Sequence, residues 1–132
     1  LQADLDKINK VCRELHTEVK DRVLHWMQQG KKVVLLGGDH STPLGYYEAL
    51  ASVHDNFGIL HLDAHMDLRI AYEGFTYSHA SIMYNALQIP QISKLVQVGI
   101  RDFCEQEVEV VQKANGRVLV NTDADLKKET FE

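Results

Sequence analysis

Three side chains that bind divalent cations stand at alternate positions near the middle of the chain. Asp63, His65 and Asp67 directly follow the apolar segment 57–62. Side chains two residues apart point the same way in an extended chain, so these three can converge on one point. Imidazole and carboxylate groups suit Mn²⁺, Fe²⁺, Zn²⁺ or Mg²⁺. A carboxylate from Asp63 or Asp67 could also bridge two such cations about 3.5–4 Å apart.

A further candidate ligand, His40, lies upstream. The apolar run 33–36 leads into Gly37-Gly-Asp-His-Ser41, a pattern that predicts a strand ending in a glycine turn with His40 at its exit. A bound pair of cations would lower the pKa of a shared water towards about 7, which makes hydroxide available for hydrolysis. The two motifs together predict a metal site, whereas either motif alone could be an ordinary polar loop.

Other polar residues near these motifs have competing interpretations. The carboxylate of Asp39 could cap the following helix or orient a ligand, and the capping role is favoured. His61 shares its parity with Asp63 but lies deeper in the strand, so we interpret it as a core histidine. His79 opens a helix after the metal motif, where an imidazole could transfer protons. We interpret His16, on the first helix, as a surface residue.

The elements that would position these residues alternate along the chain. Apolar residues at helical spacing predict a helix over 5–27, ended by Gly30, and Pro43 opens a second helix through about residue 53. Further predicted elements are strands over 32–36, 57–62, 95–100 and 116–120, and helices over 79–87 and 105–114. This alternation predicts an α/β fold with a parallel sheet covered on both faces. Ligands of such folds collect beyond the carboxyl ends of the strands.

Composition limits the class of protein. A chain of 132 residues that is 45% hydrophobic can form one domain with a core. Its net charge of −5 argues against nucleic acid or an anionic membrane as the main partner. Cys12 and Cys104 are too few for a disulfide framework and predict free thiols in a reducing compartment. The sequence has neither a membrane-length apolar run nor a signal-peptide pattern, so we expect a soluble, cytoplasmic protein.

Three motifs together resemble the ureohydrolase family of arginase, agmatinase and formimidoylglutamase. They are Gly37-Gly-Asp-His-Ser41, Asp63-Ala-His-Met-Asp67 and Gln97-Val-Gly-Ile-Arg101. The resemblance spans residues 32–102 and implies a three-layer αβα sandwich with a mainly parallel sheet. It also implies a centre of two manganese ions. By position, His40 would bind one ion and His65 the other, with Asp63 and Asp67 as further ligands.

The reaction that the resemblance implies is hydrolysis of a carbon–nitrogen bond in a linear amidine by hydroxide held between the manganese ions. Asp67 and His79 are then the expected catalytic residues. His79 lies where the family has a histidine associated with substrate binding and proton transfer. The expected partner is a small guanidino or formimino molecule, and a homo-oligomer is compatible with the family.

Arg69 could determine which substrate binds. Arginases carry an asparagine at this position, whereas the Asp67-Leu-Arg69 continuation resembles the formimidoylglutamase branch. A guanidinium matches a carboxylate bidentately, so Arg69 could hold a dicarboxylic substrate such as formimidoylglutamate and would repel the cationic tail of agmatine. The alternative is that Arg69 pairs with Glu73 or another acid of its loop.

One part of the family's metal site is not in this sequence. The family takes two further aspartates from an Asp-x-Asp-x-x-Asp-Pro motif, and Asp123-Ala-Asp125 matches only its first spacing, so we interpret that segment as a loop. We expect residues 1–132 to be a single partial arginase-like domain, without the family's N-terminal strand and C-terminal metal-binding half. Such a piece is expected to be inactive alone. The alternative is a non-catalytic binding domain with an incomplete metal site.

Overall fold

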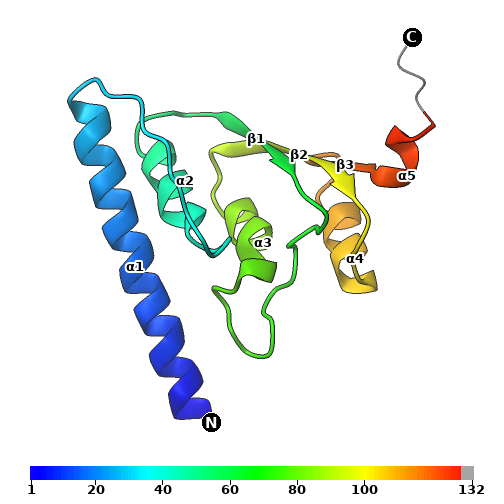
Figure 1. Ribbon diagram of the computed structural model, residues 1–132, viewed down its shortest axis with the longest axis horizontal. Helices are drawn as coiled ribbons and strands as arrows, with labels where there is room; N and C mark the ends of the chain where they lie inside the picture. Colours follow the sequence, from blue (N-terminus) through cyan, green and yellow to red (C-terminus); the bar gives the residue numbers. More distant parts are fainter. Residues whose placement is uncertain (129–132) are drawn as a thin grey trace.

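A parallel sheet lies at the centre of the computed structural model, which describes residues 1–128 (Figure 1). Its three strands are β1 (Phe57–Leu62), β2 (Ile92–Ile100) and β3 (Val118–Thr122), hydrogen-bonded in the order β1-β2-β3. The predicted α/β class with a parallel sheet is confirmed. Residues 129–132, the end of the predicted domain, lie outside the described part of the chain.

Helices lie on one side of this sheet (Figure 1). They are α1 (Gln2–Gln28), α2 (Pro43–Ala51), the short η1 (His79–Ser81) with α3 (Ile82–Leu87), and α4 (Glu105–Lys113). The short α5 (Asp123–Leu126) follows β3. None of the helices within residues 1–128 combines the length and the apolar character that a membrane crossing requires.

The opposite face of the sheet is exposed. Leu60 and Leu62 of β1 are 67% and 70% exposed, and Leu119 of β3 is 47% exposed. The expected cover on both faces is therefore not found within residues 1–128. Crossovers between parallel strands are right-handed, and both crossovers step the same way along the sheet, so α3 and α4 lie on the same face. Cover of both faces requires a reversal of strand order, which periodicity alone does not reveal.

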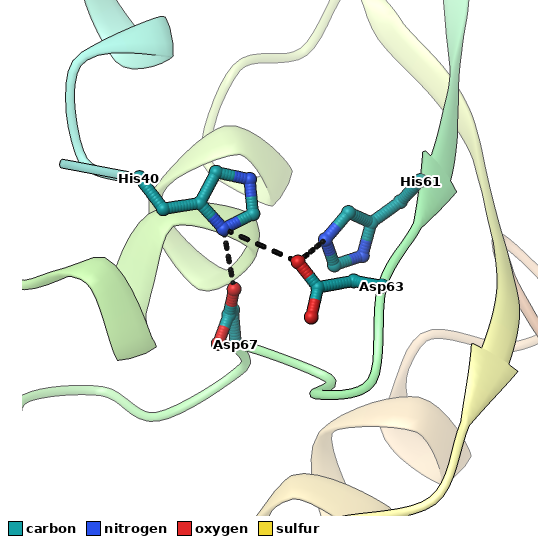
Figure 2. Close-up of side chains that lie close together, drawn as sticks. All are labelled: His40, His61, Asp63 and Asp67. Atoms are coloured by element: carbon teal, nitrogen blue, oxygen red, sulfur yellow. Dashed lines mark hydrogen bonds and ion pairs between the residues drawn. The ribbon is translucent and has the colours of Figure 1, made fainter. Parts of the chain in front are cut away.

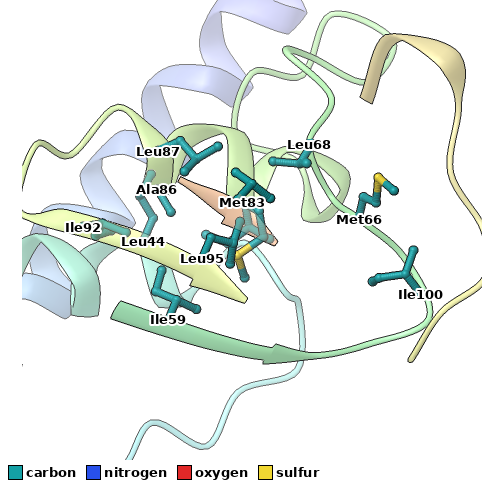
Figure 3. Packing of buried hydrophobic residues seen from close by; sticks show 12 residues of the cluster. Leu44, Ile59, Met66, Leu68, Met83, Ala86, Leu87, Ile92, Leu95 and Ile100 are labelled. Carbon is teal, nitrogen blue, oxygen red and sulfur yellow. The ribbon is translucent and has the colours of Figure 1, made fainter. Parts of the chain in front are cut away.

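The core lies between the covered face and α2, α3 and α4. Ile59, Leu95 and Val118 are register partners across the three strands, and all three are buried. Met83 and Ala86 of α3 pack against them (Figure 3). Each large apolar side chain buried in this way contributes about 1.5–3 kcal/mol. This packing holds the sheet against α3, and the candidate ligands follow at the carboxyl end of β1.

The predicted strand over 32–36 is not formed. Its residues have no regular structure, and Val34 and Leu36 are 88% and 96% exposed. Tyr46 Oη donates a hydrogen bond to the carbonyl of Val33 at 2.9 Å. A strand is stable only where a neighbour satisfies its backbone groups, and no described strand lies beside this segment. The apolar composition of residues 32–36 therefore predicted a strand, but this segment has no partner strand within residues 1–128.

The segment predicted as a loop at 123–125 is the helix α5. The side-chain oxygen of Thr122 accepts a hydrogen bond from the backbone N–H of Asp125 at 3.1 Å. This is an N-cap, which satisfies one of the free donors at a helix start. A threonine before two acidic residues was thus a helix-start signal, and the loop interpretation is wrong.

His16 is buried between α1 and α2, so its prediction as a surface residue is wrong. Only 1% of it is exposed, and its ring packs edge-on against Tyr77 at 5.1 Å. The helices approach closely at Gly45, where an added Cβ would lie 2.2 Å from the carbonyl oxygen of His16. Neither ring nitrogen has a hydrogen-bond partner among the described residues. Burial therefore lowers the pKa of His16, and the charge of Arg13 adds to this.

We expect this buried imidazole to make the protein less stable as the pH falls below about 6.5, the pKa of a free histidine. Because the pKa of His16 is lowered in the folded state, the unfolded chain binds more protons between the two values. The contribution of His16 to stability is therefore present above about pH 6.5 and is lost below it. For one proton, the slope is at most about 1.4 kcal/mol per pH unit.

Denaturant unfolding between about pH 5 and 8 measures this slope, since that window contains the titration of histidine. The His16→Leu variant should show a shallower loss of stability at acid pH than the unaltered protein. His54→Gln, which removes an exposed imidazole, is the control and should leave the slope unchanged. Equal slopes for His16→Leu and the unaltered protein would contradict the prediction.

Candidate metal centre

Four side chains converge at the carboxyl end of β1 (Figure 2). His40, His61, Asp63 and Asp67 each place one possible ligand atom within 4.8 Å of the others. Nitrogen and carboxylate ligands lie about 2.0–2.2 Å from a cation such as zinc. The distances between the four ligand atoms are therefore close to those expected for atoms that surround one ion. Imidazole and carboxylate donors together fit Mn²⁺, Fe²⁺ or Zn²⁺, and the residues present therefore fit a divalent cation.

His40 is presented by a tight turn before α2. The carboxylate of Asp39 accepts a hydrogen bond from the backbone N–H of Ser41 at 2.9 Å. Hydrogen bonding to the side chain of Ser41 first, and to its backbone as well, lowers the pKa of Asp39. Thr42 Oγ1 donates to the carbonyl of Asp39 at 2.8 Å. A Cβ on Gly37 would lie 2.8 Å from that hydroxyl, so the close approach favours glycine. Asp39 thus orders the turn that precedes α2, but it does not cap that helix, whose N-cap is Thr42.

Asp67 is buried and has a strained backbone. Its φ of 53° lies in the left-handed region, which costs a residue with a β-carbon roughly 1–2 kcal/mol. Its carbonyl accepts hydrogen bonds from the backbone N–H groups of Met83 and Tyr84 at 3.0 and 3.2 Å, at the start of α3. Its carboxylate accepts a hydrogen bond from His40 Nδ1 at 2.8 Å. This hydrogen bond raises the pKa of His40.

The two carboxylate oxygens of Asp63 face different histidines. Oδ2 lies 3.6 Å from His40 Nδ1 and 3.5 Å from His61 Nε2. Oδ1 lies 3.3 Å from His65 Nδ1 and accepts the backbone N–H of His65 at 2.9 Å. Partial burial opposes the charge, but the His65 hydrogen bond and the nearby imidazoles outweigh it and lower the pKa of Asp63. An ionised carboxylate placed in this way can bridge two cations.

His65 lies outside the group of four. Its side chain is 59% exposed, and its Nε2 lies 3.7 Å from a carboxylate oxygen of Asp102. The structure therefore brings His40, Asp63 and Asp67 together. It places His65, the fourth predicted ligand, beside Oδ1 of Asp63, the carboxylate oxygen that faces away from His40. His61 completes the group of four instead.

A cavity of about 190 Å³ opens beside these residues. Asp67, Arg69 and His79 all line it, so the predicted catalytic and substrate-binding side chains share one space. The guanidinium of Arg69 lies 5.4 Å from the ring centre of Tyr72. Among residues 1–128 Arg69 forms no ion pair, so the pairing with Glu73 considered from the sequence is not found.

Glu107 of α4 is a site residue that sequence reasoning missed. Only 3% of it is exposed, and it also lines the cavity. Its Oε1 accepts the backbone N–H of Leu68 at 3.0 Å, and its Oε2 accepts that of Cys104 at 2.9 Å. One carboxylate therefore caps α4 and holds the residue that follows Asp67. The signal was a glutamate three residues after the N-cap residue Cys104, as in a capping box. Cys104, like Cys12, is a free cysteine, as predicted.

The sequence and the fold both match known proteins. Residues 2–130 match the model of the Arginase family. N(1)-aminopropylagmatine ureohydrolase of Thermus thermophilus is 37% identical over 103 residues, which cover 78% of this chain and 34% of that protein. Arginase from Medicago truncatula has a similar structure, with a TM-score of 0.82 and 31% identity, over 88% of this chain and 37% of that chain.

A third similarity concerns the fold alone. The formiminoglutamase of Trypanosoma cruzi has a TM-score of 0.75 but only 16% identity, over 88% of this chain and 40% of that chain. The chain spans 34–40% of the length of these three proteins. The resemblance seen in the three motifs is confirmed by the family match over residues 2–130. The chain belongs to the arginase family.

Proposed function

We propose that this chain is part of a binuclear manganese hydrolase that cleaves a carbon–nitrogen bond of a linear amidine. The observation that carries the proposal is the two-sided position of Asp63 between His40 and His65. Relatives named as ureohydrolase and arginase support the reaction class, and the formiminoglutamase structure is described with Mn²⁺. When bound, two such ions would lower the pKa of a shared water and supply hydroxide at neutral pH.

The residues divide into two groups around Asp63. His40 and Asp67 face one side of its carboxylate, where they would hold one ion, and His65 faces the other side, where it would hold the second. His79 lines the cavity next to Asp67, within reach of a substrate, and we assign it the transfer of a proton to the leaving amine. The single partial domain thus supplies four of the ligands.

Arg69 bears on the choice of substrate. Its guanidinium lines the cavity without an acidic partner among the described residues, and such a group binds a substrate carboxylate bidentately. A relative named N(1)-aminopropylagmatine ureohydrolase supports a cationic substrate instead. The charge of Arg69 favours a substrate that carries a carboxylate, such as formimidoylglutamate, over agmatine and its derivatives.

The test measures manganese-dependent hydrolysis of formimidoylglutamate, arginine and agmatine by a full-length protein that contains this chain. Arg69→Met should raise KM for formimidoylglutamate about 10–100-fold, because hydrogen bonds to a charged group contribute about 1.5–3 kcal/mol. Arg69→Lys keeps the charge without the planar fork and is the matched control, with a smaller increase. Preference for agmatine, or an unchanged KM in Arg69→Met, would show that Arg69 does not select the substrate.

Failure of all three substrates with manganese would instead overturn the proposed hydrolase function. The alternative is a non-catalytic domain with an incomplete metal site. These 132 residues contain four of the expected ligands and not the two further aspartates that the resemblance implies, so little turnover is expected from them alone.

A further inference from the structure

His61 and Gln97 form a buried polar pair beside the candidate metal centre. They are register partners across β1 and β2, and their exposed fractions are 5% and 0%. Gln97 Nε2 lies 2.7 Å from the carbonyl oxygen of Met66 and 3.0 Å from His61 Nδ1. Buried polar groups of this kind are expensive unless their hydrogen bonds are satisfied, so the direction of each bond can be worked out.

The orientation of the Gln97 amide follows from its contact with Met66. A carbonyl oxygen can only accept hydrogen bonds, so the amide atom 2.7 Å from it must be the nitrogen. The flipped amide would set two acceptor oxygens against each other in a buried site. The Gln97 nitrogen therefore donates one of its two N–H groups to Met66 and has the second available for His61.

That second N–H determines where the proton of His61 lies. Because Gln97 donates to Nδ1 of His61 at 3.0 Å, Nδ1 must carry a lone pair. In a neutral imidazole the other nitrogen then carries the hydrogen. Nε2 of His61 is buried without a hydrogen-bond partner among residues 1–128, and it faces Asp63 Oδ2 at 3.5 Å.

We infer that His61 is a positioning residue: Gln97 holds its ring as the Nε2–H tautomer, and this N–H orients the carboxylate of Asp63. His61 is therefore not a metal ligand, although it belongs to the group of four side chains at the site (Figure 2). A ligand nitrogen must give up its proton to bind a cation, and Gln97 keeps the proton of His61 on Nε2 by donating to Nδ1. The tautomer stands on geometry alone, while its role towards a cation rests on the proposed function.

This arrangement gives Asp63 support from both sides. The backbone N–H of His65 donates to Oδ1 at 2.9 Å, and His61 supplies the donor that faces Oδ2. Because a donor faces each oxygen, the Asp63 carboxylate is held in one orientation. In that orientation one oxygen faces His40 and the other faces His65. Partners that orient metal ligands in this way typically change metal affinity about 10–100-fold when they are removed.

The first experiment determines the tautomer in the metal-free protein by ¹⁵N NMR of the histidine rings. The protein has seven histidines, and the signals absent from His61→Phe identify His61. We expect a protonated Nε2 and an unprotonated Nδ1. A protonated Nδ1, whether in the other tautomer or in an imidazolium, would overturn the inference. This measurement needs no metal, so it is independent of the proposed function.

Zinc then serves as a diamagnetic probe in the same spectra, because imidazole and carboxylate also suit Zn²⁺. The ring signals of His40 should change on zinc addition, while His61 keeps its Nε2–H. Loss of the Nε2–H on zinc binding would make His61 a ligand and overturn the inference. Absence of any change at His40 would count against the proposed metal site and would also remove the positioning role, leaving only the tautomer.

The third experiment removes the donor. Gln97→Met should release His61 from a single tautomer and weaken Mn²⁺ binding, measured by calorimetry, about 10–100-fold. Gln112→Met, an equal change on the exposed surface of α4, is the control and should alter neither. A single Nε2–H tautomer that persists in Gln97→Met would show that Gln97 does not determine it.

Discussion

The Asp63→Asn variant should lose binding of both cations and at least about 100-fold of the hydrolytic activity of the protein. Groups that only support a ligand already change metal affinity about 10–100-fold, and Asp63 faces both halves of the proposed centre. Asparagine keeps the size of the side chain and an acceptor for the backbone N–H of His65. It removes the negative charge that a shared carboxylate contributes between two dications.

Calorimetric titration with Mn²⁺ at neutral pH and the rate of hydrolysis together measure this effect. Asp21→Asn removes the same charge from the exposed surface of α1 and should leave both quantities unchanged. Loss of one ion with retention of the other would restrict Asp63 to a single cation. Unaltered binding of two ions would show that Asp63 is not a ligand.

The Glu107→Ala variant should lower the free energy of unfolding by about 2–4 kcal/mol. The reason is that loss of its carboxylate leaves the buried N–H of Leu68 without an acceptor, which costs about 1–3 kcal/mol, and removes a helix cap worth about 0.5–2 kcal/mol. Because Leu68 directly follows Asp67, the same variant should also weaken Mn²⁺ binding.

Two variants separate these effects in denaturant unfolding. Glu107→Gln keeps an acceptor oxygen for one of the two N–H groups, so its loss of stability should be the smaller. Glu109→Ala removes a carboxylate of α4 that is 54% exposed and pairs with Lys113, where losses stay within about 1 kcal/mol. If Glu107→Ala were no less stable than Glu109→Ala, the capping role of Glu107 would be refuted.

Much of the fold could be predicted because its signals are local. The apolar segment 57–62 is β1 at the predicted bounds, and the spacing of apolar residues over 5–27 predicted α1. The segment 32–36 carries an equally strong local signal but has no neighbouring strand within residues 1–128. Strand formation depends on pairing, which no local pattern contains.

The candidate site likewise contains residues whose positions the sequence predicts and residues whose positions it does not. Asp63 and Asp67 lie together with His40, but the alternation of an extended strand does not bring them together, because β1 ends at Leu62 and Asp67 has a φ of 53°. The place of His65 was not predictable, because the chain turns sharply after β1 and alternation holds only in extended backbone. His61 lies within β1 and is buried, which agrees with its interpretation as a core histidine. The role of Glu107 depends on its contact with Leu68, which lies thirty-nine positions earlier in the chain. The spacing of residues within a motif cannot reveal such a contact.

Asp67 connects the start of α3 to His40 through its backbone carbonyl and its side-chain carboxylate. Its carbonyl holds the first amides of α3, and its carboxylate contacts His40. We therefore expect fraying of the first turn of α3 to be coupled to release of this carboxylate. A cation bound to Asp67 would stabilise that turn by mass action, and hydrogen exchange at the amides of Met83 and Tyr84 would slow with metal occupancy. The helix start thus works as a reporter of the metal site.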